Sequence, residues 1–217
     1  MAIKILLADD HAIVRDGLRR SLQQEEDMEV IGQAKDGLST IQMSRELSPD
    51  IVLMDISMPD INGMDTCREI TRDFPHIKVI GLSMHSAKRF VSEMFKAGAS
   101  GYLPKNCEFT ELVTAIRTVM SGKTYLSPSI ADVVVDNFVR VSAEEKNSVF
   151  FTLTKRERQV LQLMAEGKTT KQIGQSLHIS PKTVEAHRLR VMEKLNINNV
   201  AQLTKYAIQE GLTTIEI

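Results

Sequence analysis

Asp50-Ile51-Val52-Leu53-Met54-Asp55-Ile56-Ser57-Met58-Pro59 is the most informative segment of the chain. The apolar run 51–54 is too short for a helix and too uniformly apolar for a strand with one wet face. It predicts a strand buried on both sides, as in a parallel sheet covered by helices. Loop-forming residues follow at 58–63, so the strand ends at Asp55. Open α/β sheets bind ligands at this carboxyl edge, which makes Asp55 a candidate functional residue.

Similar apolar runs lie on both sides of this segment, and helical periodicity follows each of them. Strands are predicted over 3–8, 28–34, 51–54, 77–83 and 100–103. Helices are predicted over 12–24, 38–47, 63–73, 88–97 and 108–120. This alternation predicts an α/β fold: a flavodoxin-like, doubly wound, five-stranded parallel sheet in the order 2-1-3-4-5.

The alternating pattern ends near residue 121. Residues 122–151 predict a linker with a short helix over 130–139. No strand pattern follows, so we expect two domains, 1–121 and 152–217, the second small and all-α.

Helix-start signals organise this second part. Capping boxes begin at Thr154 and Thr169, and Ser180-Pro181 combines an N-cap with proline at the first helical position. A short helix, a tight turn and a longer helix from Pro181 predict a helix-turn-helix. A further helix is predicted over 200–209.

Composition is that of an ordinary globular protein, with 42% apolar and 25% charged residues. Residues 1–140 carry 16 Lys and Arg against 20 Asp and Glu, and residues 141–217 carry 11 against 8. The second part therefore favours an anionic partner. No apolar run is long enough to span a membrane, and no signal peptide is recognisable. Cys67 and Cys107 are far apart in the sequence and have no His or Cys at the spacing of metal ligands. We expect a cytoplasmic protein with free thiols and no membrane contact.

Carboxylates, a hydroxyl and an ammonium gather where the predicted strands end. In the expected sheet order, Asp9, Asp10 and Asp55 share one edge, Ser83 ends the fourth strand and Lys105 follows the fifth. Crowded carboxylates suit Mg²⁺. Asp55 would then attack a phosphoryl group whose charge the metal and Lys105 neutralise. Each residue alone is more typical of a cap or turn, but the combination favours a site.

The predicted helix from Pro181 has two faces. An apolar stripe contains Val184, His187, Val191 and Leu195. The other side carries Lys182, Glu185, Ala186, Leu189 and Arg190, with Arg188 on a flank. Basic residues there would attract DNA phosphates. The polar face of this helix by itself is also compatible with a helical bundle that binds another protein instead of DNA.

Residues 1 to about 121 resemble the receiver domain of two-component response regulators. The resemblance rests on Asp9-Asp10, Asp55, Met58-Pro59, Gly63, Ser83, and Tyr102 three residues before Lys105. It implies that Asp55 is the phosphoacceptor and that Mg²⁺ is held by Asp9, Asp10, Asp55 and the Ser57 backbone carbonyl. By the same resemblance, Ser83, Tyr102 and Lys105 bind the phosphoryl group or rearrange with it.

Further positions follow from this resemblance. Ser57 and His85 would tune the lifetime of the phosphoryl group. Lys105 is followed by Asn106 where many receivers have proline, which leaves the isomer of that peptide open.

Residues 151–212 resemble the LuxR-type helix-turn-helix. The matching positions are Leu153-Thr154, Arg156-Glu157, Gly167, Lys171-Gln172-Ile173-Gly174, Ser180, Thr183-Val184-Glu185, His187 and Lys194-Leu195. The implied DNA contacts are Lys171, Lys182, Thr183, Glu185, Ala186, Arg188, Leu189 and Arg190. The implied dimerisation residues are Val200, Leu203 and Ala207.

Two positions depart from the commonest LuxR-type pattern. Gly174 replaces the usual alanine and should weaken its helix slightly. Glu185 replaces a frequent lysine and would change the base that is read, because glutamate accepts a hydrogen bond from cytosine N4.

Together the resemblances imply a response regulator of the NarL/FixJ class. A sensor histidine kinase would phosphorylate Asp55, and phosphorylation would promote homodimerisation and binding to promoter DNA. The chain would not be an enzyme, although it would dephosphorylate itself slowly. One alternative is an aspartate-nucleophile phosphatase, which wants an acidic residue at the position of Ser57. Another is a regulator that works without phosphorylation.

Overall fold

The computed structural model describes residues 2–84, 88–131 and 149–213. Contacts divide the chain into two compact units, residues 1–141 and 142–217, which are described separately. Of the helix predicted over 130–139, only the first residues are described, and 128–131 are helical. His85 lies outside the described residues. In the part of the chain that is described, no helix is long and apolar enough to cross a membrane.

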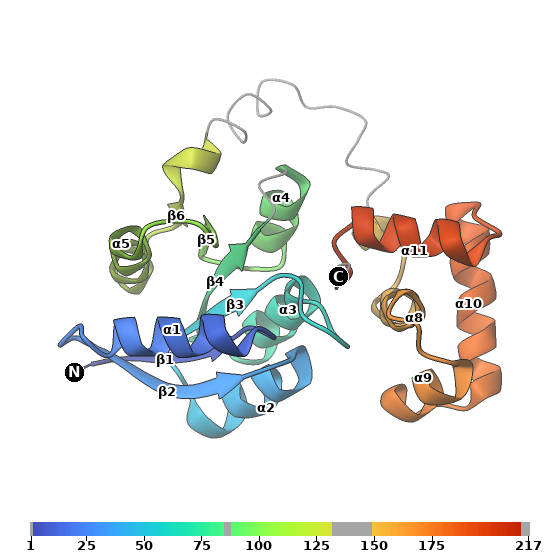
Figure 1. Cartoon of the computed structure of the whole chain (residues 1–217), viewed down its shortest axis with the longest axis horizontal. Coiled ribbons are helices and arrows are strands. Elements are labelled where there is room, and N and C mark those ends of the chain that lie inside the picture. Colours follow the sequence, from blue (N-terminus) through green and yellow to red (C-terminus); the bar gives the residue numbers. More distant parts are fainter. Residues whose placement is uncertain (1, 85–87, 132–148, 214–217) are drawn as a thin grey trace. The chain divides into compact units, whose positions relative to one another are not determined.

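The first unit is built on a parallel sheet, drawn as arrows in Figure 1. Its strands are β1 (Ile3–Ala8), β2 (Met28–Ala34), β3 (Ile51–Asp55), β4 (Lys78–Ser83), β5 (Gly101–Pro104) and β6 (Tyr125–Leu126). Their order is 2-1-3-4-5-6, which confirms the predicted order of the first five. The two-residue β6 lies in the predicted linker and was missed, because so short a strand has no periodicity to read.

The two edge strands of this sheet are irregular or short. β2 pairs with β1 through a register shift, since Ile5 lies opposite Val30 and Leu6 opposite Gly32. One extra residue of β2 therefore bulges from the ladder. At the other edge, β6 pairs with β5 over two residues only.

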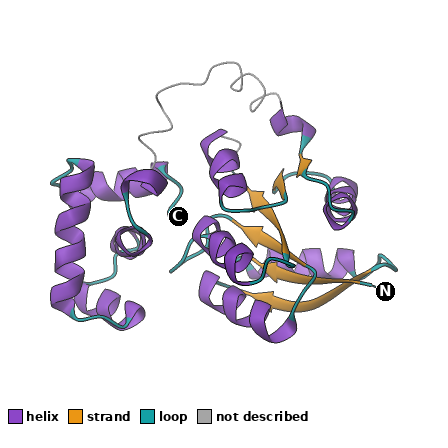
Figure 2. Cartoon of the chain, turned by 180° about the vertical axis from the view of Figure 1, so that it is seen from behind, coloured by secondary structure: helices purple, strands orange, loops and turns teal. Residues whose placement is uncertain are grey.

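Helices cover both faces of the sheet. They are α1 (Ala12–Leu22), α2 (Gly37–Leu47), α3 (Gly63–Asp73), α4 (Lys88–Lys96) and α5 (Phe109–Met120). Figures 1 and 2, taken from opposite sides, show α1 and α5 on one face and α2, α3 and α4 on the other. All five residues of β3 are buried, as expected for a central strand with two covered faces.

The second unit consists of helices in the described residues. They are α7 (Val149–Thr152), α8 (Lys155–Ala165), α9 (Thr170–Leu177), α10 (Pro181–Leu195) and α11 (Val200–Gln209). Both predicted capping boxes form, at Thr154 with Glu157 and at Thr169 with Gln172. The Ser180 side chain accepts from the Thr183 amide and caps α10.

The turn between α9 and α10 explains Gly174. The Ile179 amide donates to the Gly174 carbonyl at 2.9 Å, and a β-carbon on Gly174 would lie 2.8 Å from the Ile179 carbonyl oxygen. His178, between them, has a left-handed backbone with φ of 53°. The sequence predicted only a weaker helix here, whereas the glycine permits close approach of the turn to α9.

Glu157 links the start of α8 to the end of α10. Its side chain is 4% exposed, and Lys194 Nζ lies 2.7 Å from its Oε2. Burial raises the pKa of Glu157, but hydrogen bonds from Lys194 and Thr154 outweigh burial and hold the pKa below its ordinary value. Ionised Glu157 therefore stabilises the unit above the ordinary carboxyl pKa, and this contribution is lost as the pH falls through the folded-state value.

We expect Glu157→Gln to lower the unfolding free energy of this unit by about 1–2 kcal/mol at pH 7, because the charged partner of Lys194 is lost. The wild-type advantage should close in acid, where Glu157 itself becomes protonated. Hydrogen exchange of the α8 amides in the full-length protein measures the loss of stability at pH 7 and its pH dependence. A difference that stays constant down to pH 3 would contradict the charge-based explanation.

Candidate functional site

Five predicted residues lie at the carboxyl edge of the sheet in the first unit. Asp9 directly follows β1, Asp55 and Ser83 end β3 and β4, and Lys105 directly follows β5. Asp10 is next to Asp9. Because β1, β3, β4 and β5 are adjacent and parallel, these ends meet at one edge.

An ammonium bridges two of the carboxylates. Lys105 Nζ lies 2.7 Å from Asp9 Oδ2 and 2.9 Å from Asp55 Oδ2. The carboxylates are each 4% exposed and the lysine side chain is 11% exposed. The Ser57 amide donates to the other Asp55 oxygen at 3.2 Å. The peptide between Lys105 and Asn106 is trans.

Burial dominates the electrostatics of Asp55. Desolvation, with a smaller contribution from the neighbouring Asp9, raises the pKa of Asp55 to about 6, although Lys105 and the Ser57 amide act to lower it. Burial lowers the pKa of Lys105, but the charges and hydrogen bonds of Asp55 and Asp9 outweigh it and the pKa is raised. Lys105 therefore stays charged, and its charge favours the ionised, nucleophilic form of Asp55.

The oxygen atoms present fit a magnesium ion. Ligand atoms of Asp9, Asp10, His11 and Asp55 all lie within 4.8 Å of one another. Carboxylate oxygens are the hard ligands that Mg²⁺ takes. Sequence reasoning missed His11, whose Nδ1 lies 2.9 Å from Asp10 Oδ1 and 3.1 Å from Asp9 Oδ1. Its position directly after two aspartates was the available signal.

Gly63 presses against the backbone of the candidate phosphoacceptor. Its amide donates to the Ile56 carbonyl at 2.8 Å. A β-carbon on Gly63 would lie 2.1 Å from the Asp55 carbonyl oxygen and 2.8 Å from the Ile56 α-carbon. The start of α3 therefore fixes the main chain of Asp55, and only glycine fits there.

Ser83 and Tyr102 both lie inside the domain. Each is 0% exposed, and a hydrogen bond joins their side chains. Burial raises the pKa of Tyr102 to about 12. Both predicted switch residues thus occupy inward positions.

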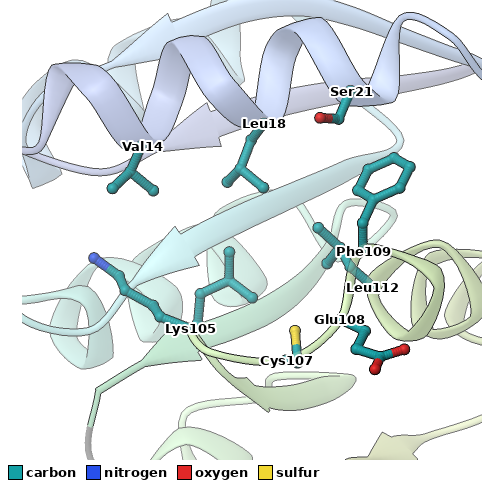
Figure 3. A pocket seen from close by; sticks show the side chains of 9 residues that line it. Val14, Leu18, Ser21, Lys105, Cys107, Glu108, Phe109 and Leu112 are labelled. Atoms are coloured by element: carbon teal, nitrogen blue, oxygen red, sulfur yellow. The ribbon is translucent and has the colours of Figure 1, made fainter.

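A small cavity of about 170 Å³ lies between α1 and α5. In Figure 3, Val14 and Leu18 project from α1 toward the side of the cavity formed by Phe109 and Leu112. Cys107 also lines this cavity, and burial raises the pKa of its thiol, so the thiol stays protonated. Both cysteines are free, as predicted.

The helix α10 has the predicted faces. In the stripe, Val184 and Val191 are buried and His187 and Leu195 are half-buried. On the other side, Lys182, Thr183, Ala186, Leu189 and Arg190 are exposed, as is Lys171 on α9. Glu185 and Arg188 are partly exposed and lie 3.6 Å apart between Oε2 and Nη1. All the predicted DNA-contacting side chains are therefore accessible.

The predicted dimerisation residues do not share one surface. Val200 is 43% exposed, whereas Leu203 and Ala207 are 1% and 0% exposed and pack in the hydrophobic core of their own unit. Leu203 and Ala207 therefore belong to the inner stripe of α11, which stabilises the unit itself. Of the three residues, Val200 is the exposed one.

Comparison with known families places the chain in a class of regulators that join a receiver to a DNA-binding domain. Residues 5–117 match the family described as response regulator receiver domain. Residues 151–207 match the family described as bacterial regulatory proteins, luxR family. The chain belongs to the two-component response regulators, in the NarL/FixJ class. The two matched domains are those of a DNA-binding regulator, so the phosphatase alternative is set aside.

Individual relatives agree over nearly the whole length. Oxygen regulatory protein NreC of Staphylococcus carnosus is 37% identical over 214 residues, covering 97% of this chain and 99% of the relative. Response regulator UvrY of Escherichia coli is 37% identical, with 99% and 97% covered. Among solved structures, RcsB of Salmonella enterica serovar Typhimurium, bound to promoter rprA with the phosphomimetic BeF3⁻, has a TM-score of 0.63 at 26% identity, with 95% and 98% covered.

Proposed function

We propose that Asp55 accepts a phosphoryl group from a sensor histidine kinase, and that phosphorylation promotes dimerisation and the binding of promoter DNA by α10. The observation that carries this proposal is the Lys105 bridge between Asp9 and Asp55 at the carboxyl edge of the sheet. It holds the Asp55 carboxylate ionised and oriented in a buried pocket, as a nucleophile requires.

In the transfer step, an Asp55 carboxylate oxygen forms a bond to phosphorus while the bond from phosphorus to the kinase histidine nitrogen breaks. The electron pair returns to that nitrogen, which takes a proton. Lys105 would face the new charge, and the Ser83 hydroxyl would donate to a phosphoryl oxygen. Slow attack of water on the acyl phosphate would release phosphate and restore Asp55, without a second substrate.

Asp9, Asp10, Asp55 and the Ser57 carbonyl would hold Mg²⁺. The ion supplies charge neutralisation for the phosphoryl oxygens when it is bound. The two carboxylates that Lys105 now bridges are among these ligands, so the lysine partly compensates the same negative charge.

Phosphorylation would act through the switch residues Ser83 and Tyr102. Both side chains are buried, and a hydrogen bond joins them. A phosphoryl group bonded to Ser83 would stabilise this inward arrangement and bias the surface over β4 and β5.

The DNA partner follows from the exposed face of α10. Lys182, Arg188 and Arg190, with Lys171 of α9, supply positive charge, and Glu185, Ala186 and Leu189 lie among them for base contacts. A homodimer would place two copies of α10 on two half-sites, with Val200 at the surface of α11. Since its proposed partner is promoter DNA, we place the protein in the cytoplasm.

The test compares wild-type protein with Asp55→Asn, each with and without BeF3⁻ and Mg²⁺. Light scattering measures mass in solution, and a random duplex DNA pool reports sequence-specific enrichment. We expect BeF3⁻ to raise both dimer content and enrichment in wild type and neither in the variant. Equal dimerisation and enrichment of untreated wild type and Asp55→Asn would show that phosphorylation is not the control.

A further inference from the structure

The two helices of the helix-turn-helix are joined by a side-chain contact that the DNA-binding proposal does not use. Thr170, the first residue of α9, donates from Oγ1 to Glu185 Oε1 at 2.7 Å. The cap of α9 is made by Thr169 and Gln172, so the Thr170 hydroxyl is not needed for capping. It is directed instead to a residue of α10.

Both oxygens of the Glu185 carboxylate face a partner. Oε1 accepts from Thr170, and Oε2 lies 3.6 Å from Arg188 Nη1. The N-terminal end of α9, where Thr170 lies, also carries the positive end of the helix dipole, which favours a nearby carboxylate. Although its side chain is 46% exposed, Glu185 is thus held between Thr170 and Arg188.

We infer that Thr170 is a specificity-determining residue, which positions the Glu185 carboxylate to read one base pair. This inference rests on the proposed binding of DNA by α10. A carboxylate only accepts hydrogen bonds, so it favours a base that presents an amino group in the major groove, such as cytosine N4. A glutamate that swings freely accepts from more than one base step, whereas one held by Thr170 discriminates.

The inference separates two kinds of effect. A residue that only supports the fold or contacts phosphate changes affinity for all sequences alike. A positioning residue changes the ratio between the best sequence and its single-base variants. Thr170→Val removes the hydroxyl and keeps the shape, and Thr170→Ser keeps the hydroxyl.

The experiment uses full-length, BeF3⁻-treated protein. A random duplex pool is enriched by wild type, and fluorescence anisotropy then measures binding to the enriched duplex and to each single-base variant. Glu185→Ala identifies the base pair that Glu185 reads. At that base pair we expect Thr170→Val to reduce the wild-type discrimination by roughly fivefold, a fraction of what a good base contact provides. Thr170→Ser should restore it, and Thr170→Val should add nothing to Glu185→Ala.

The possible outcomes are distinct. If Glu185→Ala alters discrimination at one base pair but Thr170→Val leaves it unchanged, or weakens binding to all duplexes equally, the role of Thr170 is refuted while DNA reading by α10 stands. If wild type enriches no sequence, the proposed DNA binding fails, and the inference fails with it. Thermal unfolding of each variant verifies that the domain is folded.

Discussion

Acetyl phosphate and Mg²⁺ are expected to add one phosphoryl group to the protein, and Asp55→Asn is expected to abolish the adduct completely. The amide of asparagine is not a nucleophile. Among the described residues, Asp55 is the carboxylate that both contacts Lys105 and accepts a hydrogen bond from the Ser57 amide. Intact mass spectrometry measures the adduct. Omitting Mg²⁺ should also suppress it, because the phosphoryl charge is then poorly neutralised.

Asp60→Asn is the matched control for this experiment. Asp60 lies on the same loop, and its backbone is left-handed with φ of 63°, a conformation that asparagine tolerates well. The adduct should form as in wild type. An adduct that persists in Asp55→Asn, or that disappears in Asp60→Asn, would mean that Asp55 is not the acceptor.

Gly63→Ala is expected to destabilise the first unit by about 3 kcal/mol, the upper range for overpacking a core. A β-carbon 2.1 Å from the Asp55 carbonyl oxygen meets backbone, which cannot rotate away as a side chain can. The start of α3 must therefore move away from β3, and the hydrogen bond between the Gly63 amide and the Ile56 carbonyl is lost. Hydrogen exchange of the β3 amides in the full-length protein measures the change.

Gly17→Ala provides the contrasting substitution. Gly17 lies inside α1, and a β-carbon there meets nothing within 4 Å. Alanine should stabilise this helix by up to about 1 kcal/mol through its higher helical propensity. If both substitutions changed stability in the same direction, the close approach of Gly63 to Asp55 would not explain its effect.

The sheet and its acidic pocket were predictable because both follow from sequence position alone. The carboxyl ends of the parallel strands lie at one edge of the sheet, so Asp9, Asp55 and Lys105 were expected there once the strand order was inferred. Periodicity also gave the helices to within a few residues. The stripe of α10 was predictable for the same reason, since the spacing of Val184 and Val191 fixes one face.

Other features depend on packing that no local pattern encodes. The inward position of Tyr102 depends on tertiary packing, and the need for glycine at Gly174 depends on how closely the turn at Ile179 approaches α9. Leu203 and Ala207 pack in the core of their own unit, a position that the sequence does not reveal because an apolar stripe looks the same whether its own domain or a second chain covers it. The hydrogen bond between Thr170 and Glu185 depends on the angle between two helices, which the sequence does not state.

The margins of the sheet constrain how two copies can associate. An edge strand with a long row of free amides and carbonyls can pair with a strand of another chain, which leads to sheet-extended dimers and to fibrils. The bulge in β2 twists one margin away, and β6 ends the other after two residues. Neither offers a straight template, so the proposed dimer should form through helical surfaces, which would separate again when the phosphoryl group is lost.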